Sequence, residues 1–423
     1  MKKINTSPIS GMQEFTPDVQ VVFDRIKNTI DNTYRKHGFI KIETPMIDRC
    51  EILLAKAGGD TEKQIYKVVK TAEASEGADQ ALRFDHTVPL ARYVVEHENV
   101  LSFPFKVCQI GRNFRGERAQ KGRFREFYQC DADVVGRGEL PLYYDADVIA
   151  TALAALLALG LDTPVVARVS NRKILTGVIE GLNLQEKANA IYNIIDHAEK
   201  VPMEKTVAAF TEVGVTGEKQ EKILRLIGLG GGRDEVVQEL RGLGVTNEIL
   251  ETGIFEFEYV LKMLEAMGLG KNVRADMKIV RGLDYYTGTV FEFALPEHAE
   301  VGSVGGGGRY DNLAGYFTDL KLPGVGASIG LSRLFYVLSE KKLVEITGER
   351  PVDVAVVPIT EAEVAAAEMV AEKLRADGKT VMVVVSDKRL GDKMKYAASV
   401  ARQGIVIGET EAASGEYIIR DLR

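Results

Sequence analysis

The chain has 423 residues, which is too long for one ordinary hydrophobic core and fits two or three domains. Its composition, 45% hydrophobic and 27% charged, excludes wholesale disorder. The formal net charge of -7 argues against non-specific nucleic-acid binding, which needs a broad basic surface, but it allows a local basic groove for a structured RNA.

Targeting and redox signals are weak. The first fifteen residues lack an apolar core of signal-peptide length, and the apolar run at residues 148–161 is shorter than the roughly 20 residues that span a bilayer. We therefore expect a cytoplasmic protein. Cys50, Cys108 and Cys130 show no C-x-x-C spacing, so a disulfide framework or a zinc site is not expected.

The N-terminal segment predicts a helix followed by an edge strand. Residues 18–37 repeat apolar side chains at the spacing of an amphipathic helix, and Gly38 follows as a C-cap. The strand-like FIKIETPMID contains Pro45, which a central strand does not tolerate. This edge can form a dimer seam. Further on, Asp85 and Thr87 lie between a short strand and a helix predicted over residues 87–97.

The middle of the chain predicts two strands, a buried helix and a helical module. The strands cover residues 105–114 and 126–135, and the helix at 142–159 is apolar on several faces. Residues 171–269 are helical in pattern, with turns at glycines that include Gly230–Gly232. Strand character returns from residue 274, and residues 350–423 alternate strand and helix as in a small α/β domain.

Two stretches carry chemistry. RGLDYYTGTVFEF, residues 281–293, reads as a strand pair with a polar cluster that is costly to bury without a polar ligand, although Arg281 and Asp284 could form an ordinary ion pair. Residues 112–125 hold five arginines and one lysine, which suit phosphate oxygens, although a solvated basic loop explains them equally well. The glycine runs at 230–232 and 305–308 do not fit a P-loop or a dinucleotide fingerprint.

Taken together, these stretches resemble the histidyl-tRNA synthetase family of class II aminoacyl-tRNA synthetases. GFIKIETPMID is similar to motif 1, FRGERAQKGRFREFYQCDAD to motif 2 and GVGASIGLSRL to motif 3. RGLDYYTGTVFEF and GGGGRYDNL resemble the histidine-specific signatures. The resemblance covers nearly the whole chain, in order. It implies an α+β fold in which helices flank an antiparallel sheet: a catalytic domain at 1–170 and 271–340, a helical insertion at 171–270 and an anticodon-binding domain at 350–423.

The resemblance assigns roles to individual residues. Those expected to bind ATP are Arg115, Glu117, Arg123, Phe127 and Arg333. Those expected to bind histidine are Asp85, Thr87, Arg115, Gln129, Asp133, Arg281, Tyr285, Tyr286 and Tyr310. Arg115 and Arg281 are expected to stabilise charge on the reacting phosphate, and Arg118 and Gln120 to approach the acceptor end of tRNA. Lys388, Arg389, Lys393 and Lys395 would form a basic face on the C-terminal domain.

Simpler alternatives exist for single residues. Asp133 could pair only with an arginine of the basic loop, Thr87 could only cap its helix, and Phe127 and Tyr310 could be core aromatics. The sequence also departs from many bacterial members of the family, which have glutamate where Asp85 and Asp133 stand. In these stretches it is closer to the eukaryotic and archaeal branch.

The implied reaction uses ATP and Mg²⁺ to activate L-histidine as an adenylate and then transfers the histidyl group to tRNA(His), in a homodimer built through the motif 1 region. No metal ligand is expected from protein side chains. Two rivals share the fold: a synthetase-like regulatory subunit of ATP phosphoribosyltransferase, and a sensor of histidine or uncharged tRNA. Histidine-dependent pyrophosphate exchange would separate the three.

Overall fold

The structure is a computed structural model that describes residues 4–55, 60–70, 78–199, 201–280, 286–346 and 349–422. Its contacts divide the chain into two compact units. The first contains residues 1–13 and 27–344, and the second contains residues 14–26 and 345–423. Each unit is described by itself.

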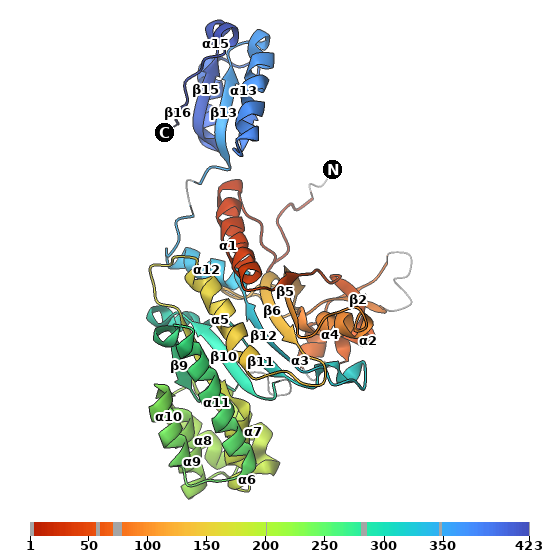
Figure 1. Cartoon of the computed structure of the whole chain (residues 1–423), viewed down its shortest axis with the longest axis vertical. Helices are drawn as coiled ribbons and strands as arrows, with labels where there is room; N and C mark the ends of the chain where they lie inside the picture. Colours follow the sequence, from red (N-terminus) through yellow and green to blue (C-terminus); the bar gives the residue numbers. More distant parts are fainter. Residues whose placement is uncertain are drawn as a thin grey trace. The chain divides into compact units, whose positions relative to one another are not determined.

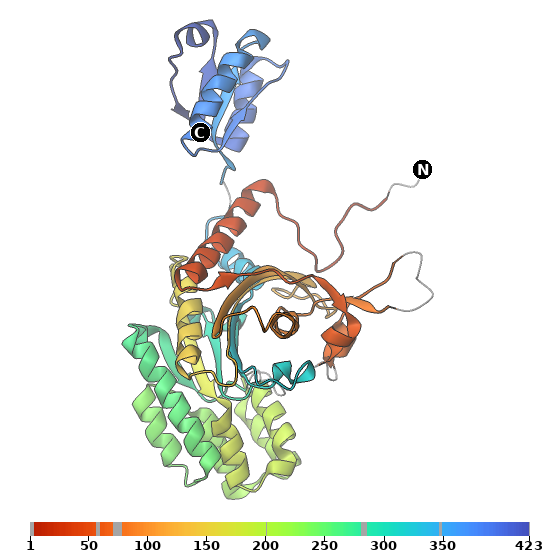
Figure 2. The same cartoon turned by 45° about the vertical axis from the view of Figure 1, so that its right-hand side comes forward.

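A mixed sheet of nine described strands forms the centre of the first unit, and Figures 1 and 2 show that it is strongly curved. Its middle strands are antiparallel, while one strand at each side pairs in parallel with its neighbour. In order across the sheet the strands are β1 (Ile40–Lys41), β5 (Phe105–Phe114), β6 (Glu126–Val135), β12 (Gly324–Ile329), β11 (Ser303–Tyr310), β10 (Thr289–Ala294), β7 (Val166–Asn171), β9 (Val273–Asp276) and β8 (Gly230–Gly231).

Helices pack on this sheet through apolar residues. Helix α5 (Tyr143–Leu157) packs on β12 and β6 and is buried almost along its whole length, as its apolar sequence predicts. Helix α4 (Thr87–Glu96) packs Leu90 and Val94 against Phe105, Val107 and Val135. Helix α12 (Leu331–Glu340) contacts β6 and β11. Together with the sheet, these helices confirm the α+β class.

The N-terminal elements match the predicted helix and edge strand. Helix α1 (Pro17–Lys36) buries the predicted apolar stripe, with Val22, Ile26, Ile30 and Tyr34 each at most 4% exposed. Strand β1 lies at the edge of the large sheet, and Pro45 falls outside it. Next come a small sheet of β2 (Ile47–Arg49), β4 (Gln80–Leu82) and β3 (Lys67–Val68), and the helices α2 (Cys50–Leu54) and α3 (Asp60–Gln64).

The predicted helical module follows β7. Figure 1 shows its helices gathered beside β9, in green. One detail differs from the sequence prediction: Gly230–Gly231 is not only a turn, because its backbone pairs with β9 as β8. The helices are α6 (Arg172–Gly181), α7 (Ala188–Ala198), α8 (Met203–Glu212), α9 (Gly217–Gly228), α10 (Arg233–Arg241) and α11 (Glu248–Ala266).

The C-terminal part of the second unit has the predicted α/β pattern. Its sheet has the order β14-β13-β15-β16, with the first three strands parallel. The elements are β13 (Val352–Pro358), α13 (Val364–Ala376), β14 (Val381–Val383), α14 (Leu390–Val400), β15 (Ala401–Ile407), α15 (Glu409–Ser414) and β16 (Arg420–Asp421). No helix within the described ranges is long and apolar enough to cross a membrane.

Two sequence predictions need correction. Residues 281–293 do not form a strand pair in the part that the structure describes, because only β10, from Thr289, is a strand. Lys393 does not belong to an exposed basic face. It is 4% exposed, and its ammonium donates to the carbonyls of Pro358 (3.1 Å) and Ile359 (3.2 Å), since helical spacing turns residue 393 inward.

Candidate active site

A row of polar side chains on β6 forms one side of the candidate site. Gln129, Asp131 and Asp133 alternate along the strand, so all three face the same side of the sheet. Gln129 accepts from Asn113 Nδ2 and donates to Ser328 Oγ, each over 2.7 Å. These bonds fix the Gln129 amide between β5 and β12, so its position is set before any ligand arrives.

Glycines on β11 and β12 leave the space that this row needs. A Cβ at Gly326, opposite Asp133 in register, would lie 1.9 Å from Asp133 Oδ1. A Cβ at Gly308 would lie 2.8 Å from Tyr286 Cδ1, and one at Gly324 would lie 2.2 Å from the Tyr310 ring. The glycines of β11 and β12 therefore leave space for Asp133, Tyr286 and Tyr310, three side chains that are predicted to bind histidine.

Asp133 and Tyr310 are joined directly. The Tyr310 hydroxyl donates to Asp133 Oδ1 over 2.7 Å, and both residues are buried. The Tyr310 ring packs with Val88, Ala91 and Tyr286. Tyr310 is therefore a core aromatic and also a polar partner, and the described bond of Asp133 goes to a tyrosine rather than to an arginine of the basic loop.

The Asp133 carboxyl resists ionisation. Burial, together with the nearby charge of Asp131, raises its pKa to about 8, although the hydrogen bond from Tyr310 opposes the shift. A carboxyl in this state can donate or accept a hydrogen bond near neutral pH.

The raised pKa predicts a pH-dependent stability difference in the ligand-free protein. Between about pH 4 and pH 8 the folded state holds a proton on Asp133 that the unfolded chain has released, so this group makes the folded state less stable as pH rises. Asp133→Asn cannot ionise and should gain stability relative to wild type, on the order of 3 kcal/mol between pH 5 and pH 8. Chemical denaturation across this range measures it. A pH-independent difference would contradict it.

Asp85 and Thr87 lie in the turn that enters α4. Asp85 Oδ1 accepts from the backbone N–H of Thr87 (3.0 Å) and of Val88 (3.1 Å). Asp85 therefore caps the helix, and the alternative that Thr87 serves as the cap is wrong, since the N-cap position is His86. The cap fixes the Asp85 carboxylate at the start of α4.

Arg115 lies between two aromatic rings at the end of β5. Its guanidinium carbon is 4.3 Å from the ring centroid of Phe84 and 5.0 Å from that of Phe127, and its Nε donates to Phe84 O over 3.3 Å. Burial lowers the pKa of this guanidinium, while the charges of Asp85 and Glu117 oppose the shift. The two rings and the Phe84 carbonyl together hold the Arg115 guanidinium in place.

The basic loop between β5 and β6 is a closed hairpin. Arg115 N donates to Arg125 O, and Gln120 and Arg123 exchange backbone bonds of 3.1 and 2.9 Å at the tip. Glu117 lies 3.7 Å from Arg123, joined as an ion pair. Arg118 and Gln120 are exposed at the tip, where a large ligand can reach them.

Arg333 lies on α12, next to this hairpin. Its Nη2 donates to Val301 O over 2.5 Å, and its Cγ lies 3.9 Å from the position of a Cβ on Gly122 of the hairpin. The structure thus brings the tip of the hairpin at Gly122 and Arg333 together, although they are far apart in the sequence.

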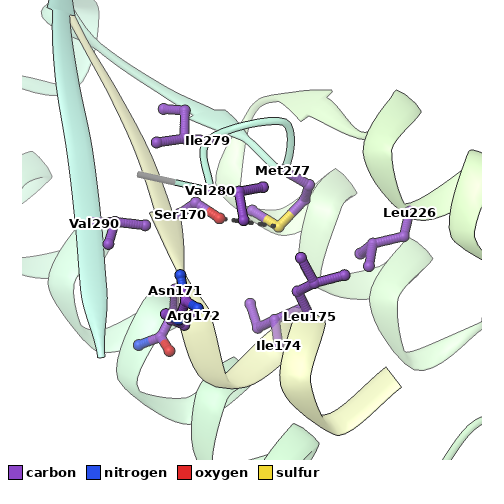
Figure 3. Close-up of a pocket in the computed structure, with 10 residues that line it drawn as sticks. All are labelled: Ser170, Asn171, Arg172, Ile174, Leu175, Leu226, Met277, Ile279, Val280 and Val290. Carbon is purple, nitrogen blue, oxygen red and sulfur yellow. Dashed lines mark hydrogen bonds between the residues drawn. The ribbon is translucent and has the colours of Figure 1, made fainter. Parts of the chain in front are cut away.

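Part of the predicted site lies outside the described residues: Arg281 and Tyr285. Two pockets that the sequence did not predict are lined by residues of the helical module and of nearby strands. One, in Figure 3, is narrow and mostly apolar, and the Ser170 hydroxyl donates to Met277 Sδ across it (3.8 Å). The other is an open cleft of ≈ 420 Å³ lined by residues of α6 and α11 together with Tyr286 and Thr287. Tyr286 therefore contacts the Tyr310 cluster and also borders this cleft.

Sequence reasoning missed the network that supports Tyr310. Arg309 donates from Nε and Nη2 to the fully buried Asp145, over 2.8 to 3.2 Å, and from Nη2 to Leu140 O over 3.0 Å. Its carbonyl accepts from Thr287 N over 2.8 Å. The sequence did contain an indication of this pair: an arginine inside a glycine-dense strand and an aspartate inside an apolar helix. Two such buried charges are stable only when they pair with each other.

Comparison with known proteins identifies the family. The family model described as histidyl-tRNA synthetase matches residues 11–334, and the one described as an anticodon binding domain matches residues 353–423. A histidine--tRNA ligase of Clostridium tetani is 40% identical over 100% of this chain and 95% of its own length. The chain belongs to the histidyl-tRNA synthetase family. It is a class II aminoacyl-tRNA synthetase, a ligase for histidine and tRNA(His), and use of ATP follows from that membership.

Solved structures agree with this assignment. The crystal structure of histidyl-tRNA synthetase from Nostoc sp. PCC 7120 is 34% identical, with a TM-score of 0.86 and coverage of 99% of this chain and 97% of that chain. An ATP phosphoribosyltransferase regulatory subunit/histidyl-tRNA synthetase from Bacillus halodurans has a TM-score of 0.79 at 22% identity, covering 96% and 99% of the two chains. This second likeness shows the fold alone. The full-length match to the ligase favours the synthetase over the regulatory rival.

Proposed function

We propose that the polar row of β6, the Asp85–Thr87 turn and the two tyrosines form the histidine pocket. Asp133 and Tyr286 would bond the two imidazole nitrogens, and Tyr310 would hold Asp133 in place. Asp85, Thr87 and Gln129 would receive the α-amino group. The observation that carries this assignment is the buried Tyr310–Asp133 hydrogen bond, which is packed over glycines that leave no space for a side chain of their own.

ATP would lie along the hairpin. Phe127 would stack on the adenine, Glu117 would lie near it, and Arg115 would contact the α-phosphate and the histidine carboxylate. Arg123 and Arg333 would hold the outer phosphates, and we keep Arg281 and Tyr285 as proposed ligands from the sequence. The carboxylate oxygen of histidine attacks the α-phosphorus, the bond to the bridging oxygen breaks, and pyrophosphate leaves. Arg115 stabilises the developing charge.

Mg²⁺ would enter the site bound to the phosphates of ATP. In the described ranges, no group of three or more His, Cys, Asp or Glu side chains is placed to hold a metal. The carboxylate of the hairpin is Glu117, paired with Arg123. Mg²⁺ usually binds through phosphates, water and at most one or two carboxylates, so the phosphates of ATP and water would hold it here. When bound, the ion neutralises phosphate charge.

Histidine-dependent ATP–pyrophosphate exchange by the pure full-length protein tests the first step. We expect exchange with L-histidine and ATP and none with phenylalanine, because an apolar ring would leave the buried Asp133 and Tyr286 groups unpaired. Equal exchange with both amino acids would contradict the pocket.

The C-terminal domain, residues 350–423, would bind the anticodon arm. Lys388, Arg389 and Lys395 are exposed around the start of α14, so they remain a basic face without Lys393.

We also propose that residues 1–170 and 271–340 form the catalytic domain and that residues 171–270 form a helical insertion. Arg118 and Gln120 would approach the acceptor end of the tRNA. A cytoplasmic location fits a translation enzyme.

Charge reversal at this face should separate tRNA binding from activation. Arg389→Glu with Lys395→Glu should raise the KM for tRNA by about tenfold and leave pyrophosphate exchange unchanged, because phosphate contacts contribute to RNA affinity only. Lys373→Glu, an exposed lysine on α13, is the matched control. Aminoacylation across tRNA concentrations measures the effect, and an unchanged KM for tRNA would exclude this face.

We further propose a homodimer through the motif 1 region. Ile40, Met46 and Ile47 are 60%, 49% and 45% exposed there, beside the free edge of β1, which suits burial against a second copy. Sedimentation equilibrium should give twice the chain mass of 46.5 kDa. Ile47→Asp should shift the protein toward monomer, and a wild-type monomer at micromolar concentration would contradict the proposal.

A further inference from the structure

Two buried residues that the sequence did not place in the site, His86 and Asp131, connect the turn before α4 with the polar row of β6. His86 Nδ1 lies 2.9 Å from Asp131 Oδ2, and the side chains are 1% and 5% exposed. His86 stands between Asp85 and Thr87, and Asp131 stands between Gln129 and Asp133 in the row that faces the site. One hydrogen bond therefore joins the turn before α4 to the β6 row.

The surroundings are built around the His86 ring. A Cβ at Gly111 would lie 3.3 Å from His86 Nε2 and 2.6 Å from Arg83 Nη2, so only glycine leaves room for both groups. Gln109, opposite Asp131 in register, donates to His86 O over 3.4 Å. The histidine is thus held through its ring by β6 and through its backbone carbonyl by β5.

Arg83, at the other end of the turn, is held by hydrogen bonds. Its Nε donates to Arg112 O over 2.9 Å and its Nη1 to Thr44 O over 2.7 Å. With Arg83 and His86 fixed, the intervening Phe84 and Asp85 have little freedom. Phe84 is one of the two rings that stack on Arg115, and it follows Arg83 directly, so Arg83 rather than His86 holds the end of the turn that contacts Arg115.

Asp131 depends on His86 for its hydrogen bonding. Its other oxygen, Oδ1, is buried and has no hydrogen-bond partner among the described residues. Without His86 the carboxylate would be a buried charge with no described bond, two residues from Asp133. Removing one member of a buried pair costs more than the pair contributes, because the remaining group stays desolvated and unpaired.

We propose that His86 and Asp131 are a positioning pair for histidine recognition, which holds Asp85 and Thr87 over the β6 face that carries Gln129 and Asp133. The pair touches neither substrate. This inference rests on the proposed histidine pocket. It assigns to His86 a role in the affinity for histidine rather than for ATP, because the hairpin and Arg333, which would hold most of the nucleotide, do not depend on it.

Three variants test the pair. His86→Leu removes the donor at similar volume, and His86→Asn keeps a nitrogen donor at the same number of bonds from Cα as Nδ1. Asp131→Asn keeps an acceptor oxygen and removes the charge. His37→Leu is the control, since it breaks another histidine bond, to Thr151 Oγ1 (3.1 Å), away from the site residues. Pyrophosphate exchange gives KM for histidine, KM for ATP and kcat, and thermal denaturation gives Tm.

We expect His86→Leu to raise KM for histidine at least tenfold with KM for ATP within twofold, His86→Asn to recover most of the loss, and His37→Leu to change neither KM. A joint rise of both KM values in His86→Leu, or no rescue by His86→Asn, would overturn the positioning role. Asp133→Ala, which removes the carboxyl altogether, distinguishes a failure of the pocket from a failure of the pair: if it leaves KM for histidine unchanged, the proposed histidine pocket is wrong, and the inference about the pair fails with it. If it raises KM for histidine and His86→Leu does not, only the pair is wrong.

Discussion

Arg115→Ala should reduce histidine-dependent pyrophosphate exchange by about 10³-fold, the loss expected when a preorganised donor to a developing charge is removed. The guanidinium is stacked between Phe84 and Phe127 and bonded to a backbone carbonyl, so its position is set before substrate binds. Since it would contact both the α-phosphate and the histidine carboxylate, kcat should fall more than either KM rises.

Two further substitutions make this result specific. Arg115→Lys keeps the charge but loses the planar fork and the stacking, so an intermediate loss is expected. Arg112→Ala removes a neighbouring arginine that is 51% exposed and paired with Glu126, and it should leave exchange within about twofold of wild type. Similar losses in Arg112→Ala and Arg115→Ala would mean that the loop acts through its general charge, against the role given to Arg115.

Gly326→Ala should lower kcat/KM for histidine by about 10²-fold, the effect of a displacement near 1 Å in a binding site. The added Cβ would lie 1.9 Å from Asp133 Oδ1 and 2.8 Å from its Cγ, so the carboxyl must rotate away from Tyr310. KM for ATP should change little, because the hairpin and Arg333 do not contact Gly326.

The matched control is Gly228→Ala, the same change where no atom lies within 4 Å of the new Cβ. It should leave exchange and stability close to wild type. The activity of Gly326→Ala is compared with it at equal folded fraction, measured by circular dichroism. Wild-type exchange in Gly326→Ala would show that the Asp133 carboxyl does not need its observed position.

The sequence predicted those parts of the fold that follow from local periodicity. The stripe at Val22, Ile26, Ile30 and Tyr34 predicted α1, and the apolar run at 142–159 predicted the buried α5. The strand pair predicted at 281–293 is not found in the described part, 286–293, because aromatic and β-branched residues favour strands only where a partner strand pairs with them, and pairing there starts at Thr289. Lys393 was misassigned because charge alone does not say which side of a helix faces the core.

The candidate site was predicted through family resemblance and not by local pattern. Glycines 308, 324 and 326 could be read as strand or turn residues, but their use as space for Tyr286, Tyr310 and Asp133 depends on the cross-strand register. The His86–Asp131 bond depends on where the turn before α4 lies over β6, a tertiary fact. The alternation of Gln129, Asp131 and Asp133 was readable from the sequence and should have marked Asp131 as facing the site.

The most direct test of the proposed site is a crystal structure of the full chain with ATP and histidinol, which lacks the reacting carboxylate. We expect the imidazole to lie between Asp133 and Tyr286, with the α-phosphate at Arg115. An imidazole bound away from Asp133, for example in the cleft beside Arg172 and Lys173, would contradict it.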